Sequence, residues 1–322
     1  IAANVGGGGV VGGTVKNVSI IPWAIGQSLT TTLAATEMGN TFLSYVDNRG
    51  FVPLNLANEF STFSASVSGD NVRESITADL ASIAATAVNS LVVNNNTVAA
   101  GPAINVEGAG QALAVASGAM LFTLNPAAVA GNYGINLGGF DAGITTAGAN
   151  PEYVIHVVNP DAAAPTKALT ATISSQLTSV ADITKSGRGT LVLSGVNTAG
   201  GNIKKTTINE GTLEITDLDN IGGTTGGLVF AGGTLRLGAG FADDISTRFI
   251  TFQQGGATID TMTLDPVLAN SVGSGVGGLT KLGTGNLTLN AAATYTGTTT
   301  LGAGAITIGA NNATGNGGDL NV

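Results

Sequence analysis

The chain has 322 residues, a formal net charge of −9 at pH 7, a pI near 4.4 and 49 glycines. Only 10% of its residues are charged and 43% are hydrophobic, which excludes intrinsic disorder, because disorder requires low hydrophobicity and high charge. The acidic balance argues against a nucleic-acid partner and against an anionic membrane surface, since both require clustered Lys and Arg.

There are no cysteines, so disulfides and thiolate–metal sites are excluded. With His156 as the single histidine, we expect no metal and no cofactor. No stretch of about 20 residues is continuously apolar, so we expect no membrane insertion by this segment. The chain starts at Ile1 without Met or a basic leader, which favours a processed chain or a fragment of a longer protein.

Residues 1–87 are predicted to be an irregular N-terminal region that is packed on, or continuous with, the structure that follows. The glycines at 6–9 are not followed by the Lys-Ser/Thr of a phosphate-binding loop, and they indicate a Gly-rich turn. Four aromatic residues in this region form either a glycan-stacking platform or, as we favour, a local core: Trp23, Phe42, Tyr45 and Phe51.

Between Asp70 and Ala87, apolar residues recur at helical spacing, which predicts a helix. The frequent Thr and Ser leave a strand as the alternative. The spaced residues are Val72, Ile76, Leu80 and Ile83.

Residues 88–180 are predicted to form β-solenoid rungs. His156 lies in the strong strand pattern from Tyr153 to Val158, on the face opposite Ile155 and Val157. We expect a hydrogen-bonded or solvent-facing strand residue here and not a catalytic one, because Ser/His/Asp catalysis would depend entirely on this one position.

Residues 181–322 contain an internal repeat, in which the run from Ile183 to Leu193 matches the run from Leu279 to Leu289. Apolar side chains alternate with polar ones between glycines, which is the period of a strand bounded by turns. Such runs recur about every 20 to 25 residues and predict stacked solenoid rungs with an apolar interior. The leucines predicted to point inward are Leu191, Leu193, Leu213, Leu235, Leu287 and Leu289.

The second copy carries the fuller motif, G-G-L-T-K-x-G-x-G-x-L-x-L and then Y-x-G-x-T-T-L-x-x-G, from Gly277 to Gly304. It resembles the autotransporter-associated β-strand repeat. The first copy, Ile183 to Ile215, departs from the pattern, with Thr198 near the Tyr position. The resemblance implies the passenger region of a large bacterial surface or secreted protein, located outside the cell at the bacterial surface.

Lys185 and Lys281 occupy equivalent positions in the two copies. Equivalence beside a turn indicates a structural role. We expect their ammonium groups, which carry three N–H donors, to satisfy backbone carbonyls between rungs.

Paired carboxylates are the one realistic source of an active site, because two of them suffice for glycoside hydrolysis. The pairs are Asp217 with Asp219, and Asp243 with Asp244. Aspartate is also a common turn residue that accepts bonds from exposed backbone N–H groups, and we favour this interpretation.

A structural cation would need oxygen ligands, and the calcium-binding nonapeptide repeat of β-rolls is absent. Isolated loop aspartates are the remaining candidate ligands, with no position favoured: Asp141, Asp161 and Asp265.

Together these patterns predict an all-β chain, a right-handed parallel β-solenoid with a less regular N-terminal part. We expect no catalytic, cofactor or metal site, and a structural function as the rigid stalk or shaft of a bacterial surface protein or adhesin. Two alternatives stay open: a subunit of an extracellular filament, and a carbohydrate-binding or carbohydrate-cleaving β-helix. The expected partners are further copies end to end or the rest of a longer parent chain, with surface glycans as a further candidate.

Overall fold

The structure is a computed structural model, and its regular secondary structure is almost entirely β-strand. It describes residues 9, 11–28, 39–84, 86–147, 151–159, 166–198, 203–224, 226–316 and 320–321. The helices in this described part are three short 3-10 turns, η1 (Phe63–Ala65), η2 (Leu218–Ile221) and η3 (Ile245–Thr247). The chain forms two compact units: unit 1 is residues 1–181 with 187–190, and unit 2 is residues 182–186 with 191–322.

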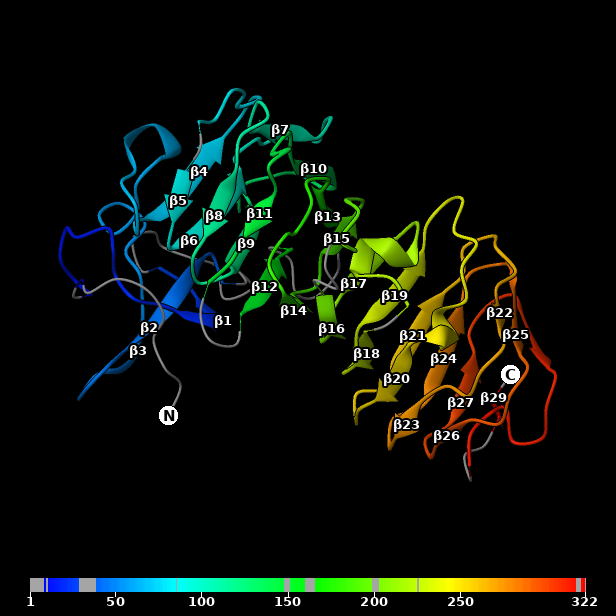
Figure 1. Cartoon of the computed structure of the whole chain (residues 1–322). Helices are drawn as coiled ribbons and strands as arrows, with labels where there is room; N and C mark the ends of the chain where they lie inside the picture. The colour runs from blue at the N-terminus through cyan, green and yellow to red at the C-terminus, as the bar shows by residue number, and fades with distance from the viewer. Residues whose placement is uncertain are drawn as a thin grey trace. The chain divides into compact units, whose positions relative to one another are not determined.

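Unit 1 contains one antiparallel and three parallel sheets (Figure 1). The antiparallel sheet has the order β1 (Ile21–Gly26), β2 (Thr41–Val46), β3 (Gly50–Pro53). The parallel sheets have the orders β4 (Asn71–Ile76), β6 (Ser90–Asn95), β9 (Ala119–Leu124), β12 (Glu152–Val157); β7 (Ile104–Glu107), β10 (Gly131–Gly138), β13 (Lys167–Ile173); and β5 (Thr86–Val88), β8 (Leu113–Val115), β11 (Ile144–Thr145).

Unit 2 repeats the parallel arrangement with shorter strands (Figure 1). The chain visits the sheets in turn and returns to each one beside its previous strand. The strand orders are β14 (Ala181–Ser186), β16 (Ile203–Ile208), β18 (Gly227–Phe230), β20 (Phe249–Phe252), β23 (Ser274–Gly275), β26 (Thr294–Tyr295); β15 (Thr190–Leu193), β17 (Thr212–Ile215), β19 (Thr234–Leu237), β21 (Ala257–Asp260), β24 (Leu279–Leu282), β27 (Thr299–Leu301), β29 (Leu320–Asn321); and β22 (Val267–Leu268), β25 (Asn286–Leu289), β28 (Ala305–Ile308).

This return of each strand to the side of its predecessor defines a parallel β-solenoid, and the predicted fold class is confirmed. In unit 2, Leu213 pairs with Leu235, 22 residues later, within the predicted rung length. In unit 1 the rungs run longer, as between Asn105 and Asn136, which are 31 residues apart and share a side-chain hydrogen bond of 2.9 Å. The right-handedness of the coil stays a prediction.

The interior of unit 2 consists of apolar rows that run from rung to rung. Leu213 pairs with Leu235, and Leu235 pairs with Ile259, so that like side chains stack. All six leucines predicted to point inward are buried, with at most 1% of their surface exposed. The period-two pattern therefore predicted the inward face correctly.

A second row is aromatic. Phe230 and Phe252 pair in register, with ring centroids 5.6 Å apart at 85°. Tyr295, the tyrosine of the repeat motif, continues the stack at 5.0 Å from Phe252, and its hydroxyl lies 2.6 Å from the Oγ1 of Thr299. Edge-on and tilted ring contacts of this kind stabilise the fold in addition to the stabilisation that comes from burying apolar area.

The helix predicted between Asp70 and Ala87 is wrong, and the strand alternative is correct for residues 71–76 and for Thr86 and Ala87. β4 occupies residues 71–76 and pairs in parallel with β6, so its backbone groups bond to the next rung and not along a helix. Ser82 has φ of +62° and bends the chain where a helix would have continued. The tertiary ladder here outweighs a local helical pattern.

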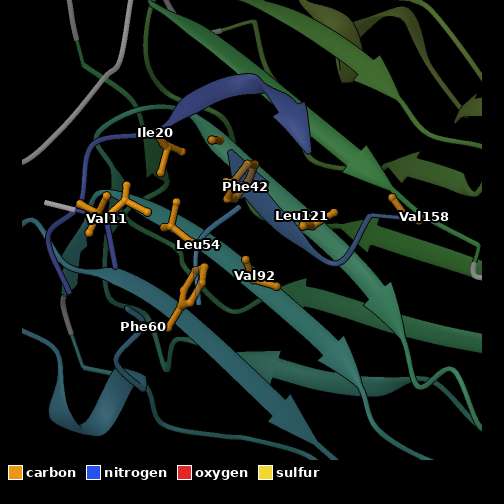
Figure 2. Close-up of a cluster of buried hydrophobic side chains, with 10 residues drawn as sticks. Val11, Ile20, Phe42, Leu54, Phe60, Val92, Leu121 and Val158 are labelled. Atoms are coloured by element: carbon orange, nitrogen blue, oxygen red, sulfur yellow. The ribbon is translucent and has the colours of Figure 1, made fainter. Parts of the chain in front are cut away.

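The N-terminal antiparallel sheet packs on the outside of the sheet formed by β6, β9 and β12. Strands β6 and β9 are consequently buried on both faces, unlike the alternating strands of unit 2. Figure 2 shows this cluster, in which Phe42 and Leu54 lie against Val92 and Leu121 of the solenoid. The first parallel strand, β4, falls inside residues 1–87.

Candidate functional site

Two lysines lie inside the solenoid, where the strand pattern places apolar side chains. Lys185 in β14 and Lys281 in β24 both have 0% of their surface exposed. Lys281 pairs with Ile259 and so continues the row of Leu235. The polymethylene stem suits such a core, but the ammonium group requires acceptors, because an unpaired buried charge is costly.

Backbone carbonyls at the turns accept from the Lys281 ammonium group. Its Nζ donates to the carbonyl oxygens of Leu282 at 2.9 Å and Gly283 at 2.7 Å, both on its own rung. It also donates to the carbonyl oxygen of Ala303 at 3.2 Å, one rung further on. The side chain therefore ties two successive turns together from the inside.

Lys185 makes equivalent bonds in the first copy. Its Nζ donates to the carbonyl oxygens of Ser186 at 3.0 Å and Glu210 at 2.9 Å. Ser186 aligns with Leu282 and Glu210 with Ala303 in the two copies. The predicted bonding of both lysines to carbonyls between rungs is confirmed.

Glycines around Lys281 leave room for this arrangement. Gly304 has φ of +71°, and a Cβ atom there would lie 2.8 Å from the Lys281 Nζ and 2.5 Å from the Gly283 carbonyl oxygen. Gly211, the equivalent residue of the first copy, has φ of +67°. The glycines of the motif thus permit two turns to close around one ammonium group.

Burial lowers the pKa of both lysines. It lowers the pKa of Lys185 to about 7, against the opposing influence of the Glu210 carboxylate. It also lowers the pKa of Lys281, where the carboxylates of Asp260 and Asp265 act in the opposite direction. Desolvation disfavours the charged form in each case.

We expect this shift to make stability depend on pH. The pKa of Lys185 is about 7 when folded and about 10.5 when unfolded, so the unfolded chain binds more protons between these values. The Lys185 contribution to the free energy of unfolding therefore rises as pH increases from 7 towards 10.5. Urea denaturation at pH 7, 8 and 9 should show wild type gaining stability relative to Lys185→Met. Parallel pH profiles for the two proteins would contradict the assignment.

Arg248 is a third internal cation, and the sequence analysis missed it. It is 2% exposed, and its guanidinium donates to the carbonyl oxygens of Gly223 and Gly227. Burial lowers its pKa to about 10. Because Arg248 belongs to no repeated motif, the sequence offered no signal for its position.

Asp217, Asp243 and Asp244 accept from backbone N–H groups, as the turn interpretation predicts. Asp219 is half-buried and takes part through its own backbone N–H. Asp217 caps η2 by accepting from the Asp219 N–H at 2.7 Å. Asp243 accepts from the Leu218 N–H at 2.8 Å, and Asp244 accepts from the Ala269 N–H at 3.1 Å, each across a rung. These side chains therefore satisfy backbone N–H groups at the turns.

Three of the aspartates line one surface pocket of unit 2. Asp243, Asp244 and Asp265 surround it together with Phe241 and Val267, and its volume is about 390 Å³. Asp265 also accepts from the Asn286 N–H at 2.7 Å, so it too bonds to the backbone of another rung. The pocket is acidic and partly apolar.

The remaining loop aspartates do not join this group. Asp141 is exposed at the turn after β10, and Asp161 lies outside the described residues, as do Gly6, Gly7 and Gly8. Gly9 forms a bridge with Val18. Within the described ranges, no group of three or more His, Asp or Glu is placed to hold a metal ion.

His156 lies at the contact between the N-terminal sheet and the solenoid. It is 3% exposed, its Nε2 is 3.0 Å from the Pro22 carbonyl oxygen, and its ring meets Phe42 edge-on at 6.2 Å. It shares a row with Leu121 and Val92. The prediction of a hydrogen-bonded strand residue is confirmed.

The four N-terminal aromatic residues divide between interior and surface. Phe42 belongs to the buried cluster, which agrees with the local core that we favoured. Trp23 and Phe51 are 52% and 60% exposed, so the predicted local core is wrong for these two residues. The Phe51 ring meets Tyr45 edge-on at 5.8 Å.

Comparison with known families identifies the repeats. The model of the passenger-associated-transport-repeat matches residues 183–215 and 279–308, the two copies that hold Lys185 and Lys281. These repeats are typical of autotransporter passenger regions. No curated protein and no solved structure matches the chain. Over the described residues, no helix is long and apolar enough to cross a membrane.

Proposed function

We propose that this passenger-associated β-solenoid acts as a stiff shaft of a bacterial surface protein, outside the cell, and performs no catalysis. Its task is to hold the parts of a longer passenger at a fixed distance. The repeats support this proposal, because they are typical of autotransporter passenger regions. The two buried lysines and the pocket aspartates also support it, because they bond to backbone groups of a neighbouring rung.

The observation that carries the proposal is the unbroken register of unit 2. Thr212, Thr234, Thr258, Thr280 and Thr300 pair one after another along a single sheet. Bending such a stack would break backbone bonds on one side and compress apolar rows on the other, which close-packed interiors resist.

Charged residues on the outer face reinforce this register. The Arg236 Nε donates to Asp260 at 3.0 Å, and its Nη1 lies 3.5 Å from the Glu214 carboxylate, so one side chain bridges three rungs. The pairs are partly exposed and each contributes modestly. Their arrangement along the stacking direction is what a shaft requires.

Mechanical pulling tests this function. With the chain held at its two ends, a shaft should extend little until groups of rungs rupture in discrete steps, because stacked repeats unfold in cooperative blocks. Smooth extension at low force would contradict the proposal.

The carbohydrate-cleaving alternative draws on the acidic pocket. Incubation with a panel of polysaccharides should release no reducing ends, because the carboxylates lining the pocket are held by backbone N–H groups. Turnover that Asp243→Asn abolishes, with the circular dichroism spectrum unchanged, would favour the enzyme.

The filament alternative draws on the last strand of one sheet. β28 pairs with β25 in register, and Ile308 is 46% exposed. Edge strands promote association between chains. Growth of light scattering with concentration, removed by Ile308→Lys, would favour a filament subunit over a monomeric shaft.

A further inference from the structure

The two repeat copies lie on different faces of unit 2, although their sequences match. In the first copy, the lysine strand β14 belongs to the sheet of β16, and the following strand β15 belongs to the sheet of β17. In the second copy, the lysine strand β24 lies instead in the sheet of β17 and β27, and β25 lies in the third sheet, with β28. The second copy is therefore displaced around the coil by one face.

An added strand accompanies the displacement. The matching strands are β14 with β24, β15 with β25, β16 with β27 and β17 with β28. Between β25 and β27 the second copy has β26, which consists of Thr294 and Tyr295. A rung of the second copy therefore crosses three sheets, whereas a rung of the first crosses two.

Two lysine contacts are the same in both copies despite this displacement. In both copies Nζ bonds to the carbonyl of the next residue and to the carbonyl at the equivalent turn one rung later. In the first copy the later carbonyl belongs to Glu210, 25 positions after Lys185. In the second copy it belongs to Ala303, 22 positions after Lys281. The bonding thus tolerates both a different face and a different rung length.

We infer that each repeat is a transferable corner clip, in which a buried lysine locks the bend of one rung to the bend of the next at whichever corner the repeat falls. The alternating strand pattern forms the two strands that flank the bend, and the glycines leave space for the ammonium group between the two turns. This inference rests on the repeat and not on the shaft function, so either can fail without the other.

Replacing each lysine separately by Met tests the corner clip, with the rate of backbone amide hydrogen exchange as the measurement. Met keeps much of the stem volume and removes the ammonium group. Lys281→Met should speed exchange at least tenfold at the Gly302 N–H, which bonds to the Lys281 carbonyl at 2.9 Å. Lys185→Met should do the same at the Asn209 N–H, which bonds to the Lys185 carbonyl at 2.9 Å. Each variant should leave the other corner within twofold of wild type.

Two further variants keep the test decisive. Lys204→Met removes an exposed lysine from β16 and should change exchange at neither corner. If a Met variant fails to fold, Lys281→Gln should recover part of the β-structure by circular dichroism, because its amide retains N–H donors. Exchange within twofold of wild type at both corners, or a Gln variant no better than Met, would overturn the corner clip.

Discussion

Replacing Leu235 by Asp is expected to lower the free energy of unfolding of unit 2 by about 4 kcal/mol or more. Leu235 has no exposed surface and lies between Leu213 and Ile259 in the central apolar row. The substitution removes apolar contacts with two rungs and introduces a carboxylate that the neighbouring apolar side chains cannot hydrogen-bond. Because each rung depends on its neighbours for burial, the damage should spread along the stack.

Urea denaturation followed by circular dichroism measures this loss, and hydrogen exchange in β17, β19 and β21 locates it. Thr234→Asp is the matched control, because Thr234 precedes Leu235 and lies half-buried on the opposite face of the strand. The control should lose about 1 kcal/mol or less, as surface substitutions do. Equal losses for the two variants would show that the assigned inward face is wrong.

Replacing Gly285 by Ala is expected to destabilise unit 2 by about 3 kcal/mol, although it adds one methyl group. A Cβ atom at this position would lie 1.8 Å from the Leu264 carbonyl oxygen and 2.6 Å from its carbonyl carbon. Both atoms belong to the backbone of the neighbouring rung, so no side-chain rotation can relieve the clash. The rungs that contain Leu264 and Gly285 would therefore have to move apart, next to the turn that Lys281 bonds.

Gly227→Ala provides the comparison for this prediction. A Cβ atom at Gly227 would meet only ordinary contacts, the nearest being the Lys205 Cγ at 3.6 Å. This variant should match wild type within about 1 kcal/mol, since removing backbone freedom from the unfolded chain offsets small losses. A thermal melt of Gly285→Ala that coincides with that of Gly227→Ala would contradict the close approach of the two rungs.

The sequence was sufficient to predict the solenoid because its signals are local and repeated. Leu191 and Leu193 alternate with polar or β-branched neighbours, and glycine brackets mark each turn. The equivalence of Lys185 and Lys281 also indicated carbonyl bonding. These features depend on period and spacing, which a single chain displays directly.

What the sequence did not predict depends on contacts between distant segments. β26 and β22 contain two residues each, which is too short for any period, so the three-sheet rungs of the second copy were not predicted. The N-terminal sheet packs on an outer row formed by Val92, Leu121 and His156. The sequence around an outward-facing apolar residue does not indicate which segment packs on it. Arg248 was missed for a similar reason, because it bonds to carbonyls more than 20 residues away.

The distance between two labelled rungs tests most directly whether the chain is a stiff stack. Because there are no native cysteines, Thr212→Cys and Thr300→Cys can be spin-labelled together without other changes. These residues are four rung steps apart on one outer face, so at about 4.8 Å per step their backbones should be separated by about 19 Å. Double electron–electron resonance should give one narrow distribution near this separation, widened only by the label linkers. A broad distribution, or one centred far above this value, would contradict the stacked solenoid.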